Sequence, residues 1–330
     1  MPATLLSSTV LLPTLRARVA SARDVVPGVR QLEFVAVDDS LLPEWTPGAH
    51  LDVHLPSGAI RQYSLCGDPS DLRSYRIAVL NVPDGRGGSA EVHTAVHAGA
   101  ELMLGVPRNQ FPLRDAPAYV FVAGGIGITP ILAMVREAAR LGKPWKLVYG
   151  ARSDSQFVFL DELTALAEAS WGLIECVAQD TDGHIDLVSL VAASGGHAVY
   201  CCGPGPMMAA LRDEMRVVGR EQDLTVERFA ADPVPQEAAG TEDTFTVELS
   251  LSGCSVSVQP GQSILEALRA AGIDAPSSCE MGICGTCETT VISGEIEHRD
   301  ALLTDAERAQ GDTMLICVSR AAGDALVLAR

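Results

Sequence analysis

Positive charge is scarce in this chain of 330 residues, which has 24 lysine and arginine residues against 42 aspartate and glutamate residues. Only Lys143 and Lys146 are lysines, and the formal net charge is −18. A surface that binds nucleic acid must supply cations to the phosphates. The composition therefore argues against nucleic acid as a partner.

Long hydrophobic runs are also missing, although 47% of the residues are hydrophobic. No run approaches the ~18 apolar residues of a membrane-spanning helix, so we expect no membrane partner. The segment MPATLLSSTVLLPTLRARVA has no basic region at its start, and Pro13 interrupts it. It is not typical of a signal peptide, and we expect a cytoplasmic protein.

Most of the nine cysteines lack the regular spacing of a secreted disulfide framework. Five of them are scattered singly or as neighbours: Cys66, Cys176, Cys201, Cys202 and Cys254. Cys254 lies in an alternating strand pattern and is predicted to be a small core residue.

The length suggests two or three domains, and the texture of the sequence changes along it. Residues 1–113 carry short β-rich segments between Gly, Pro and Asp, which predict an antiparallel barrel or sandwich. Residues 114–231 repeat strand, glycine turn and helix, which predicts a parallel sheet covered by helices. Residues 232–243, DPVPQEAAGTED, are predicted to be a linker. Residues 244–330 begin with a hairpin pattern and contain a short helix in SILEALRAAG.

The remaining four cysteines have the spacing of a metal cluster. Cys279, Cys284 and Cys287 follow C-x4-C-x2-C, and Cys317 lies further along the chain. This is the plant-type [2Fe–2S] spacing. Two irons and two sulfides need four thiolates at nearly fixed positions, and a tight loop must supply three of them.

Two glycines inside the loop, Gly282 and Gly285, permit the backbone conformations that this wrapping needs. Without a Cβ they also let N–H groups approach the sulfurs. A zinc site would more often show two C-x2-C pairs, whereas this segment has one. A disulfide is disfavoured in the cytoplasm. We therefore expect a [2Fe–2S] cluster, with zinc as the alternative.

Residues 244–330 resemble a plant-type ferredoxin, which implies a β-grasp fold. After the cluster loop, Thr304 and Glu307 are predicted to form a capping box. The segment has 12 acidic residues and 5 arginines. An acidic face suits docking to a basic electron-transfer partner, although solvated acidic faces are also common.

A glycine loop, VAGGIGITPI at 122–131, follows a strand and opens a helix. Thr129 is predicted as the N-cap and Pro130 as the first helical residue. The helix N-terminus suits a pyrophosphate, and the loop is not the G-x-G-x-x-G fingerprint. Its glycines are Gly124, Gly125 and Gly127.

A second motif, CGPGPMM at 202–208, ends another strand of the expected sheet. Together the two motifs resemble the nicotinamide domain of the ferredoxin-NADP reductase superfamily. The resemblance implies that Cys202 lies near the nicotinamide ring; the alternative is a buried thiol at a strand end. It also implies cofactor contacts from Gly203, Pro204 and Met207.

The segment YGARSDSQ would carry the adenosine ribose side of the nicotinamide cofactor. Arg152 can contact phosphate, and Asp154 would repel a 2′-phosphate, which favours NADH. The same arginine could also hold NADPH.

The segment RQYSL at 61–65 resembles the R-x-Y-S flavin motif of the same superfamily, with Gln62 as its variable residue. Arg61 would neutralise the flavin phosphate. Tyr63 would offer an aromatic face, and the hydroxyl of Ser64 would reach the reactive flavin nitrogen. The alternative is an ordinary strand with surface Arg and Tyr residues.

Three further segments complete the expected flavin site. GRGGSAEV can bind phosphate at a helix N-terminus, and YRIAVLNV would supply backbone contacts. In the superfamily an aromatic residue in the place of Phe229 covers the flavin; the alternative is a core residue. The residues concerned are Gly87, Gly88, Ser89, Ala78, Val79 and Phe229.

The order of the modules, with GRGGS and PRNQFPL, resembles the phthalate dioxygenase reductase group, which includes vanillate demethylase reductases. The resemblance covers essentially the whole chain and implies a multidomain α/β + β protein. An antiparallel flavin-binding β-barrel (1–113) would precede a parallel-sheet nucleotide-binding α/β domain (114–231). A β-grasp [2Fe–2S] ferredoxin domain (244–330) would follow the linker. Members use FMN, whereas many relatives use FAD.

The function implied is that of a reductase that passes electrons from NADH through FMN and the cluster to a terminal Rieske non-haem iron oxygenase acting on an aromatic compound. Ser64 and Cys202 would serve the hydride step, and no histidine stands in a recognisable catalytic constellation. The alternatives are a reductase for a cytochrome-type monooxygenase and a zinc-stabilised, non-catalytic regulatory protein.

Overall fold

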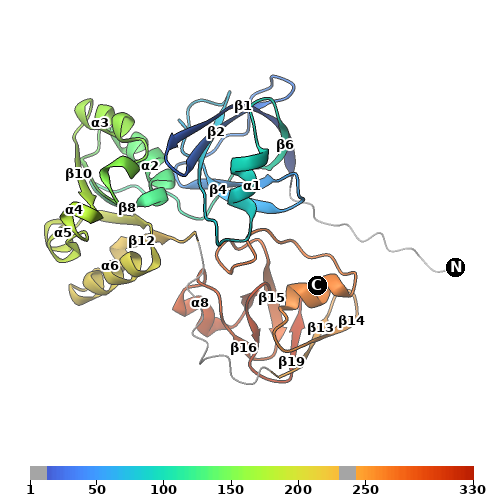
Figure 1. Ribbon diagram of the computed structural model, residues 1–330. Helices are drawn as coiled ribbons and strands as arrows, with labels where there is room; N and C mark the ends of the chain where they lie inside the picture. Colours follow the sequence, from blue (N-terminus) through green and yellow to red (C-terminus); the bar gives the residue numbers. More distant parts are fainter. Residues whose placement is uncertain (1–12, 230–242) are drawn as a thin grey trace. The chain divides into compact units, whose positions relative to one another are not determined.

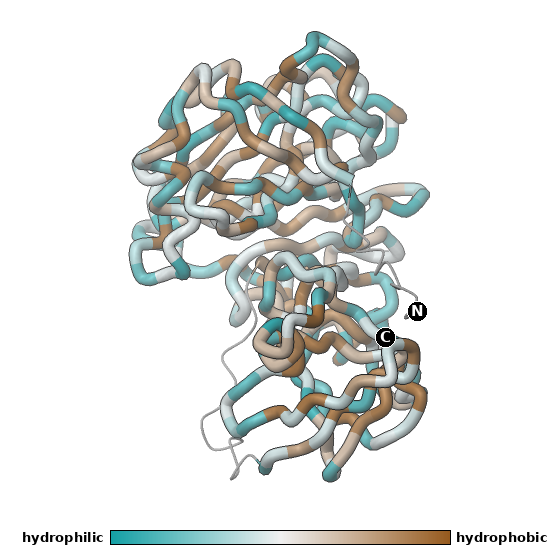
Figure 2. Tube along the Cα trace, turned by 90° about the vertical axis from the view of Figure 1, so that its right-hand side faces the viewer, coloured by the Kyte–Doolittle hydropathy of each residue, from teal (hydrophilic) through white to brown (hydrophobic). Residues whose placement is uncertain are grey.

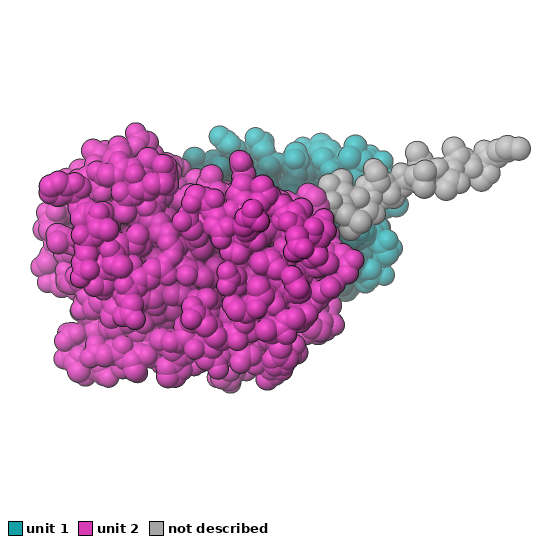
Figure 3. Space-filling view, turned by 90° about the horizontal axis from the view of Figure 1, so that it is seen from above, with its two compact units in different colours: residues 1–12, 230–330 teal, residues 13–229 magenta. Residues whose placement is uncertain are grey.

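The computed structural model describes residues 13–229 and 243–330, which belong to two compact units (Figures 1 and 3). The larger unit, residues 13–229 (magenta in Figure 3), contains both the predicted barrel and the predicted parallel sheet. The predicted linker at 232–243 lies, except for Asp243, outside the described residues. No helix within the described ranges is long and apolar enough to cross a membrane.

The first part of this unit is an antiparallel sheet with the strand order β4-β3-β6-β1-β2-β5, in which β7 also pairs with β3. The outer strands β4 and β5 lie against each other, so the sheet curls into a barrel. Its elements are β1 (Thr14–Val26), β2 (Val29–Ala36), β3 (Ala49–His54), β4 (Ile60–Ser64), β5 (Tyr75–Leu80), α1 (Gly88–Ala95), β6 (Glu101–Gly105) and β7 (Arg108–Asn109).

The barrel core forms because alternate residues of its strands point inward. Leu32 and Phe34 on β2 are fully buried, as are Leu51 and Val53 on β3. Burying each of these side chains contributes about 1.5–3 kcal/mol. Because side chains alternate along a strand, the buried set determines which residues lie on the opposite face. This also holds for β4.

The second part of this unit is a parallel sheet with the order β10-β9-β8-β11-β12. Every residue of β8, YVFVAG, is buried, as expected for a strand covered on both faces. Helices α2 and α3 pack on one face, and α5 and α6 pack on the other (Figure 1). The elements are β8 (Tyr119–Gly124), α2 (Ile128–Arg140), β9 (Trp145–Ala151), α3 (Leu160–Glu168), β10 (Gly172–Ala178), α4 (Gln179–Asp182), α5 (Leu187–Ala193), β11 (Ala198–Cys202), α6 (Gly205–Val217) and β12 (Leu224–Glu227).

The predicted N-cap of α2 is wrong. The helix begins at Ile128 with Gly127 as its cap, so Thr129 and Pro130 lie inside the first turn. A 3-10 turn at Gly125–Gly127 starts the helical path earlier than the motif suggests. The hydroxyl of Thr129 donates back to the main-chain oxygen of Ile126 at 3.0 Å.

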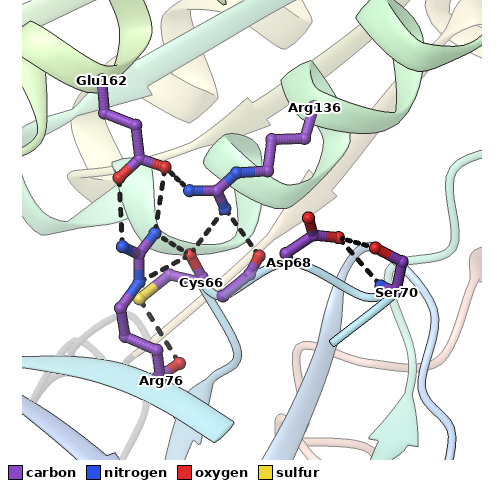
Figure 4. A network of polar contacts seen from close by, with 7 residues as sticks. Cys66, Asp68, Ser70, Arg76, Arg136 and Glu162 are labelled. Carbon is purple, nitrogen blue, oxygen red and sulfur yellow. Dashed lines mark hydrogen bonds and ion pairs between the residues drawn. The ribbon is translucent and has the colours of Figure 1, made fainter. Parts of the chain in front are cut away.

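A network of ion pairs joins the barrel to the helices α2 and α3 (Figure 4). Glu162 on α3 accepts from Arg76 of β5 at 3.1 Å and is paired with Arg136 of α2. Both guanidinium groups also donate to the main-chain oxygen of Cys66, at 2.5 Å from Arg76 and 3.1 Å from Arg136. One carboxylate therefore holds two cations from different parts of this unit.

The smaller unit, of which the structure describes residues 243–330 (teal in Figure 3), contains a sheet with the order β14-β13-β19-β15-β17 and a small sheet of β16 and β18. Its central strands β13 and β19 are parallel, and their neighbours are antiparallel. Hydrophobic and hydrophilic residues alternate along much of the trace (Figure 2). The elements are β13 (Phe245–Leu249), β14 (Cys254–Val258), α7 (Ile264–Ala270), β15 (Glu288–Ser293), β16 (Ile296–Glu297), α8 (Asp305–Gln310), β17 (Thr313–Leu315), β18 (Arg320–Ala321) and β19 (Ala325–Leu328).

Both helices of this unit begin with a capping box. The predicted box of Thr304 and Glu307 on α8 is confirmed, and Ser263 with Glu266 forms a second one on α7. The prediction for Cys254 is wrong: this residue is exposed at the start of β14, and the core begins at Val256.

Candidate functional site

The two glycine motifs interlock at the carboxyl ends of β8 and β11. A Cβ on Gly127 would lie 2.2 Å from the main-chain oxygen of Cys202, and one on Gly124 would lie 2.5 Å from Cδ of Pro204. A Cβ on Gly203 would meet Cε of Met207 at 2.5 Å. Only glycine allows this approach, which brings the two predicted nucleotide-binding motifs together.

Cys202 ends β11 as a fully buried thiol, and its register partner on β12 is Glu227. Burial raises the pKa of the Cys202 thiol well above its usual value, and the neighbouring Glu227 and Cys201 raise it further. The thiol is therefore neutral. Its position fits both the predicted nicotinamide contact and the alternative of a buried strand-end residue.

Glu227 was not among the predicted site residues. Its carboxyl group is buried, which raises its pKa to about 8, while a hydrogen bond with Ser64 lowers it. The sequence signal was an acidic residue at the end of a strand, two positions before Phe229. Ser64, Cys202 and Glu227 therefore meet at one place, although they come from both parts of this unit.

The strand β4 presents the predicted R-x-Y-S residues. Tyr63 is packed against the barrel core, and burial raises its pKa to about 12. Among the described residues, the buried side-chain atoms without a hydrogen-bond partner include Nε2 of Gln62 and Oε2 of Glu227. Unpaired buried polar atoms on β4 and on the residue that is hydrogen-bonded to Ser64 fit a site that a polar ring system completes.

Arg61 lies against the N-terminal turn of α1. A Cβ on Gly88 would meet Nε of Arg61 at 2.4 Å, and Nη2 of Arg61 donates to the main-chain oxygen of Arg86 at 2.8 Å. Gly87 has a φ of 80°, and the hydroxyl of Ser89 accepts from the N–H of Val82. A guanidinium beside free helix N–H groups suits a phosphate group.

The other predicted flavin residues differ in exposure. On β5, Ala78 faces outward toward α2, whereas the side chain of Val79 points into the barrel core. The core alternative for Phe229 is wrong, because this ring is 39% exposed. On the turn after β9, Arg152 and Asp154 are both exposed.

A cavity of about 380 Å³ lies elsewhere in this unit, between β1, β2, β5 and the start of α3. Its lining includes Gln31, Arg76, Phe157 and Glu162, and none of the predicted site residues. It is therefore separate from the glycine motifs and from β4.

The four cysteines of the predicted cluster are all buried in the smaller unit. Their thiols form two hydrogen-bonded pairs, Cys279 with Cys284 and Cys287 with Cys317. Gly282 adopts a φ of 69° within the loop, and the main-chain N–H of Met281 donates to the sulfur of Cys279 at 3.4 Å.

The four buried thiols also influence one another's pKa values. The hydrogen bond between Cys279 and Cys284 lowers the pKa of Cys284 to about 5 and raises the pKa of Cys279. The same contrast lowers the pKa of Cys287 and raises that of Cys317. Four adjacent thiolates repel one another, so all four ionise together only around positive metal ions. The donor set therefore fits a [2Fe–2S] cluster.

Comparison with known proteins agrees with this geometry. Residues 247–322 match the 2Fe-2S iron-sulfur cluster binding domain, and residues 121–213 match the oxidoreductase NAD-binding domain. The chain is 43% identical to the phenoxybenzoate dioxygenase subunit beta of Ectopseudomonas oleovorans, over 85% of this chain and 86% of that protein.

Two solved structures are similar over 96% of this chain. Phthalate dioxygenase reductase, described as a modular structure for electron transfer from pyridine nucleotides to [2Fe–2S], is 36% identical with a TM-score of 0.73 and is covered to 98%. An intact type IV self-sufficient cytochrome P450 monooxygenase is 40% identical with a TM-score of 0.84; this chain spans 41% of its length.

The fold and the three sites define a flavin- and iron–sulfur-dependent electron-transfer reductase. The chain belongs to the family of phthalate dioxygenase reductase and vanillate O-demethylase reductase. The two matched domains account for a [2Fe–2S] cluster and an NAD cofactor.

Proposed function

We propose that this chain is the reductase component of a cytoplasmic system whose terminal oxygenase is a Rieske non-haem iron enzyme acting on an aromatic compound. The names of the relatives support an oxygenase or demethylase as the electron acceptor. The observation that carries the proposal is the convergence of Ser64, Cys202 and Glu227 beside the interlocked glycine motifs, in a chain that also holds four paired cysteines.

In this proposal Arg61 and the Gly87–Ser89 turn hold the FMN phosphate, Gln62 and Tyr63 line the ring, and the main chain at Ala78 and Val79 contacts it. A bound FMN would supply the change from a two-electron donor to single-electron transfer. Ser64 donates to Glu227 and thereby holds its hydroxyl in one orientation. Phe229, which is partly exposed, covers the ring until nicotinamide arrives.

The glycine motifs and Met207 hold the nicotinamide half of NADH, with the thiol of Cys202 as its apolar neighbour. Cys202 and Glu227 are both neutral around pH 7, so neither places a fixed negative charge beside the nicotinamide ring. Arg152 binds the cofactor phosphate, and Asp154 disfavours a 2′-phosphate. NADH is therefore preferred to NADPH.

The domain division proposed is 1–113 for FMN, 114–231 for NADH, 232–243 as the linker and 244–330 for the cluster. The cluster ligands are Cys279, Cys284, Cys287 and Cys317. A second candidate acceptor is a cytochrome-type monooxygenase, favoured by the similarity to the self-sufficient P450 structure.

Reconstitution distinguishes the two acceptors. The full-length protein with NADH is mixed either with a purified Rieske aromatic oxygenase encoded beside it or with a cytochrome P450, and the hydroxylated or demethylated product is measured. The proposal predicts product formation coupled to NADH consumption with the Rieske enzyme. If product forms with the P450 and not with the Rieske enzyme, the proposed acceptor is wrong and the P450 takes its place. The variant Cys317→Ser serves as the control without an intact cluster.

A further inference from the structure

The side chain of Arg330 lies beside one of the cluster cysteines. Its Nε and Nη2 atoms donate to the hydroxyl oxygen of Thr289 at 3.0 and 2.9 Å. This hydroxyl in turn donates to the main-chain oxygen of Cys287 at 3.1 Å. Thr289 is buried, so a single enclosed hydroxyl group connects the guanidinium to a cluster ligand.

The backbone of Arg330 is fixed independently of this side chain. Its main-chain oxygen accepts from the N–H groups of Leu251 and Ser252 at 2.6 and 3.1 Å. Residue 330 also lies two residues after the end of β19, the strand between β13 and β15. The guanidinium is therefore presented to Thr289 by the rigid part of the sheet.

The charge at this position is permanent. Burial lowers the pKa of Arg330, whereas negative charge on Cys287 and Asp274 raises it. An arginine side chain keeps its proton in proteins at all ordinary pH values. The surrounding domain has 12 acidic residues against 5 arginines, so a partly buried cation here opposes the field of its surroundings.

Reduction of a [2Fe–2S] cluster adds one electron and therefore one negative charge, with no bond formed or broken. A fixed cation stabilises the reduced state more than the oxidised state. Net charge, hydrogen bonds and solvent exposure are the features that set the potential of such clusters.

We propose that Arg330, held by Thr289, is a tuning residue that raises the reduction potential of the [2Fe–2S] cluster. This inference rests on the cluster itself and not on the identity of the oxygenase. Arg330 makes the cluster a better acceptor for electrons that arrive from the flavin.

The test is a redox titration of the full-length holoprotein, with the cluster followed by its visible spectrum and by the EPR signal of its reduced form. Arg330→Gln removes the charge, and Arg330→Lys keeps it. Iron content and the oxidised spectrum are measured first, which separates loss of the cluster from a change in its potential.

We expect Arg330→Gln to disfavour reduction of the cluster by about threefold to tenfold in the one-electron equilibrium, where tenfold equals about 59 mV. Arg330→Lys should shift the equilibrium clearly less. A wild-type potential in Arg330→Gln with full iron content would overturn the proposal, as would an equal shift in both variants.

If the Arg330→Gln protein does not bind its cluster, the potential is measured in Thr289→Val instead. This variant keeps the cation and removes the hydroxyl that positions it, so the potential should again fall. An unchanged potential in this variant would then contradict the role of Arg330.

Discussion

Glu227 and Cys202 are register partners on the parallel strands β12 and β11. Cys202 is buried, and Oε2 of the partly buried Glu227 is enclosed as well. The carboxyl group of Glu227 also accepts a hydrogen bond from Ser64 of the barrel. Burial raises the pKa of both groups. Two neutral acids therefore lie where the barrel strand β4 meets the ends of the parallel sheet.

Replacement of Glu227 by alanine should slow the reduction of FMN by NADH. The change removes the acceptor that orients the Ser64 hydroxyl, and one hydrogen bond of about 1–1.5 kcal/mol corresponds to a rate change of about tenfold. Stopped-flow absorbance of the flavin under anaerobic conditions measures this rate. Glu227→Gln is the matched control, because its amide oxygen can still accept from Ser64. An alanine variant with the wild-type rate would remove Glu227 from the site.

The raised pKa of Glu227 predicts a stability that depends on pH. The folded protein keeps the proton up to about pH 8, whereas the unfolded chain loses it near 4.5. The folded state binds more protons between these values, so the free energy of unfolding falls as the pH rises through this window. Denaturant unfolding of the wild-type holoprotein and of Glu227→Gln should diverge by on the order of 1–4 kcal/mol between about pH 5 and pH 9. Parallel pH profiles of the two proteins would contradict the raised pKa.

Gly127→Ala should disrupt the meeting of the two glycine motifs. The added methyl group would lie 2.2 Å from the main-chain oxygen of Cys202, which cannot move without displacing β11. We expect a loss of about 1–3 kcal/mol in the free energy of unfolding and a weaker affinity for NADH. Gly195→Ala is the control, since a Cβ there meets nothing within 4 Å. Equal effects of both substitutions would be incompatible with the close packing of the motifs.

Removal of Glu162 should loosen the contact between the barrel and the helices. In Glu162→Ala two arginine side chains, each less than one-fifth exposed, would lose their shared carboxylate. We expect the free energy of unfolding to fall by about 1–3 kcal/mol. This is less than for a fully buried ion pair, because these residues are partly solvated. Glu137→Ala breaks a more exposed pair with Arg140 and should cost less than about 1 kcal/mol. Thermal unfolding of the two variants compares them directly.

Local spacing explains what the sequence predicted well. The cysteine loop and the turn conformation of Gly282 are encoded within a few residues, so their geometry follows from the spacing. The capping box of Thr304 and Glu307 is likewise a local pattern. The strand β8 was recognisable because its whole length is apolar.

The missed features depend on long-range packing. Glu227 matters because β12 ends beside β4 in the fold, and no local pattern reveals that proximity. The register shifts near Val19 and Asp24 of β1 depend on its pairing with β2, so the sequence of β1 alone does not reveal them. The 3-10 turn before α2 made Thr129 a helical residue, and β14 exposes Cys254 because only its later residues reach the core.

The most direct test of the electron route is an anaerobic titration of the full-length protein with NADH, followed by absorbance and EPR. The account predicts bleaching of the FMN band, the EPR signal of a reduced [2Fe–2S] cluster, and wild-type behaviour in Cys254→Ser. In Cys317→Ser it predicts flavin bleaching without the cluster signal. A wild-type protein whose flavin is reduced while its intact cluster stays oxidised would contradict the account.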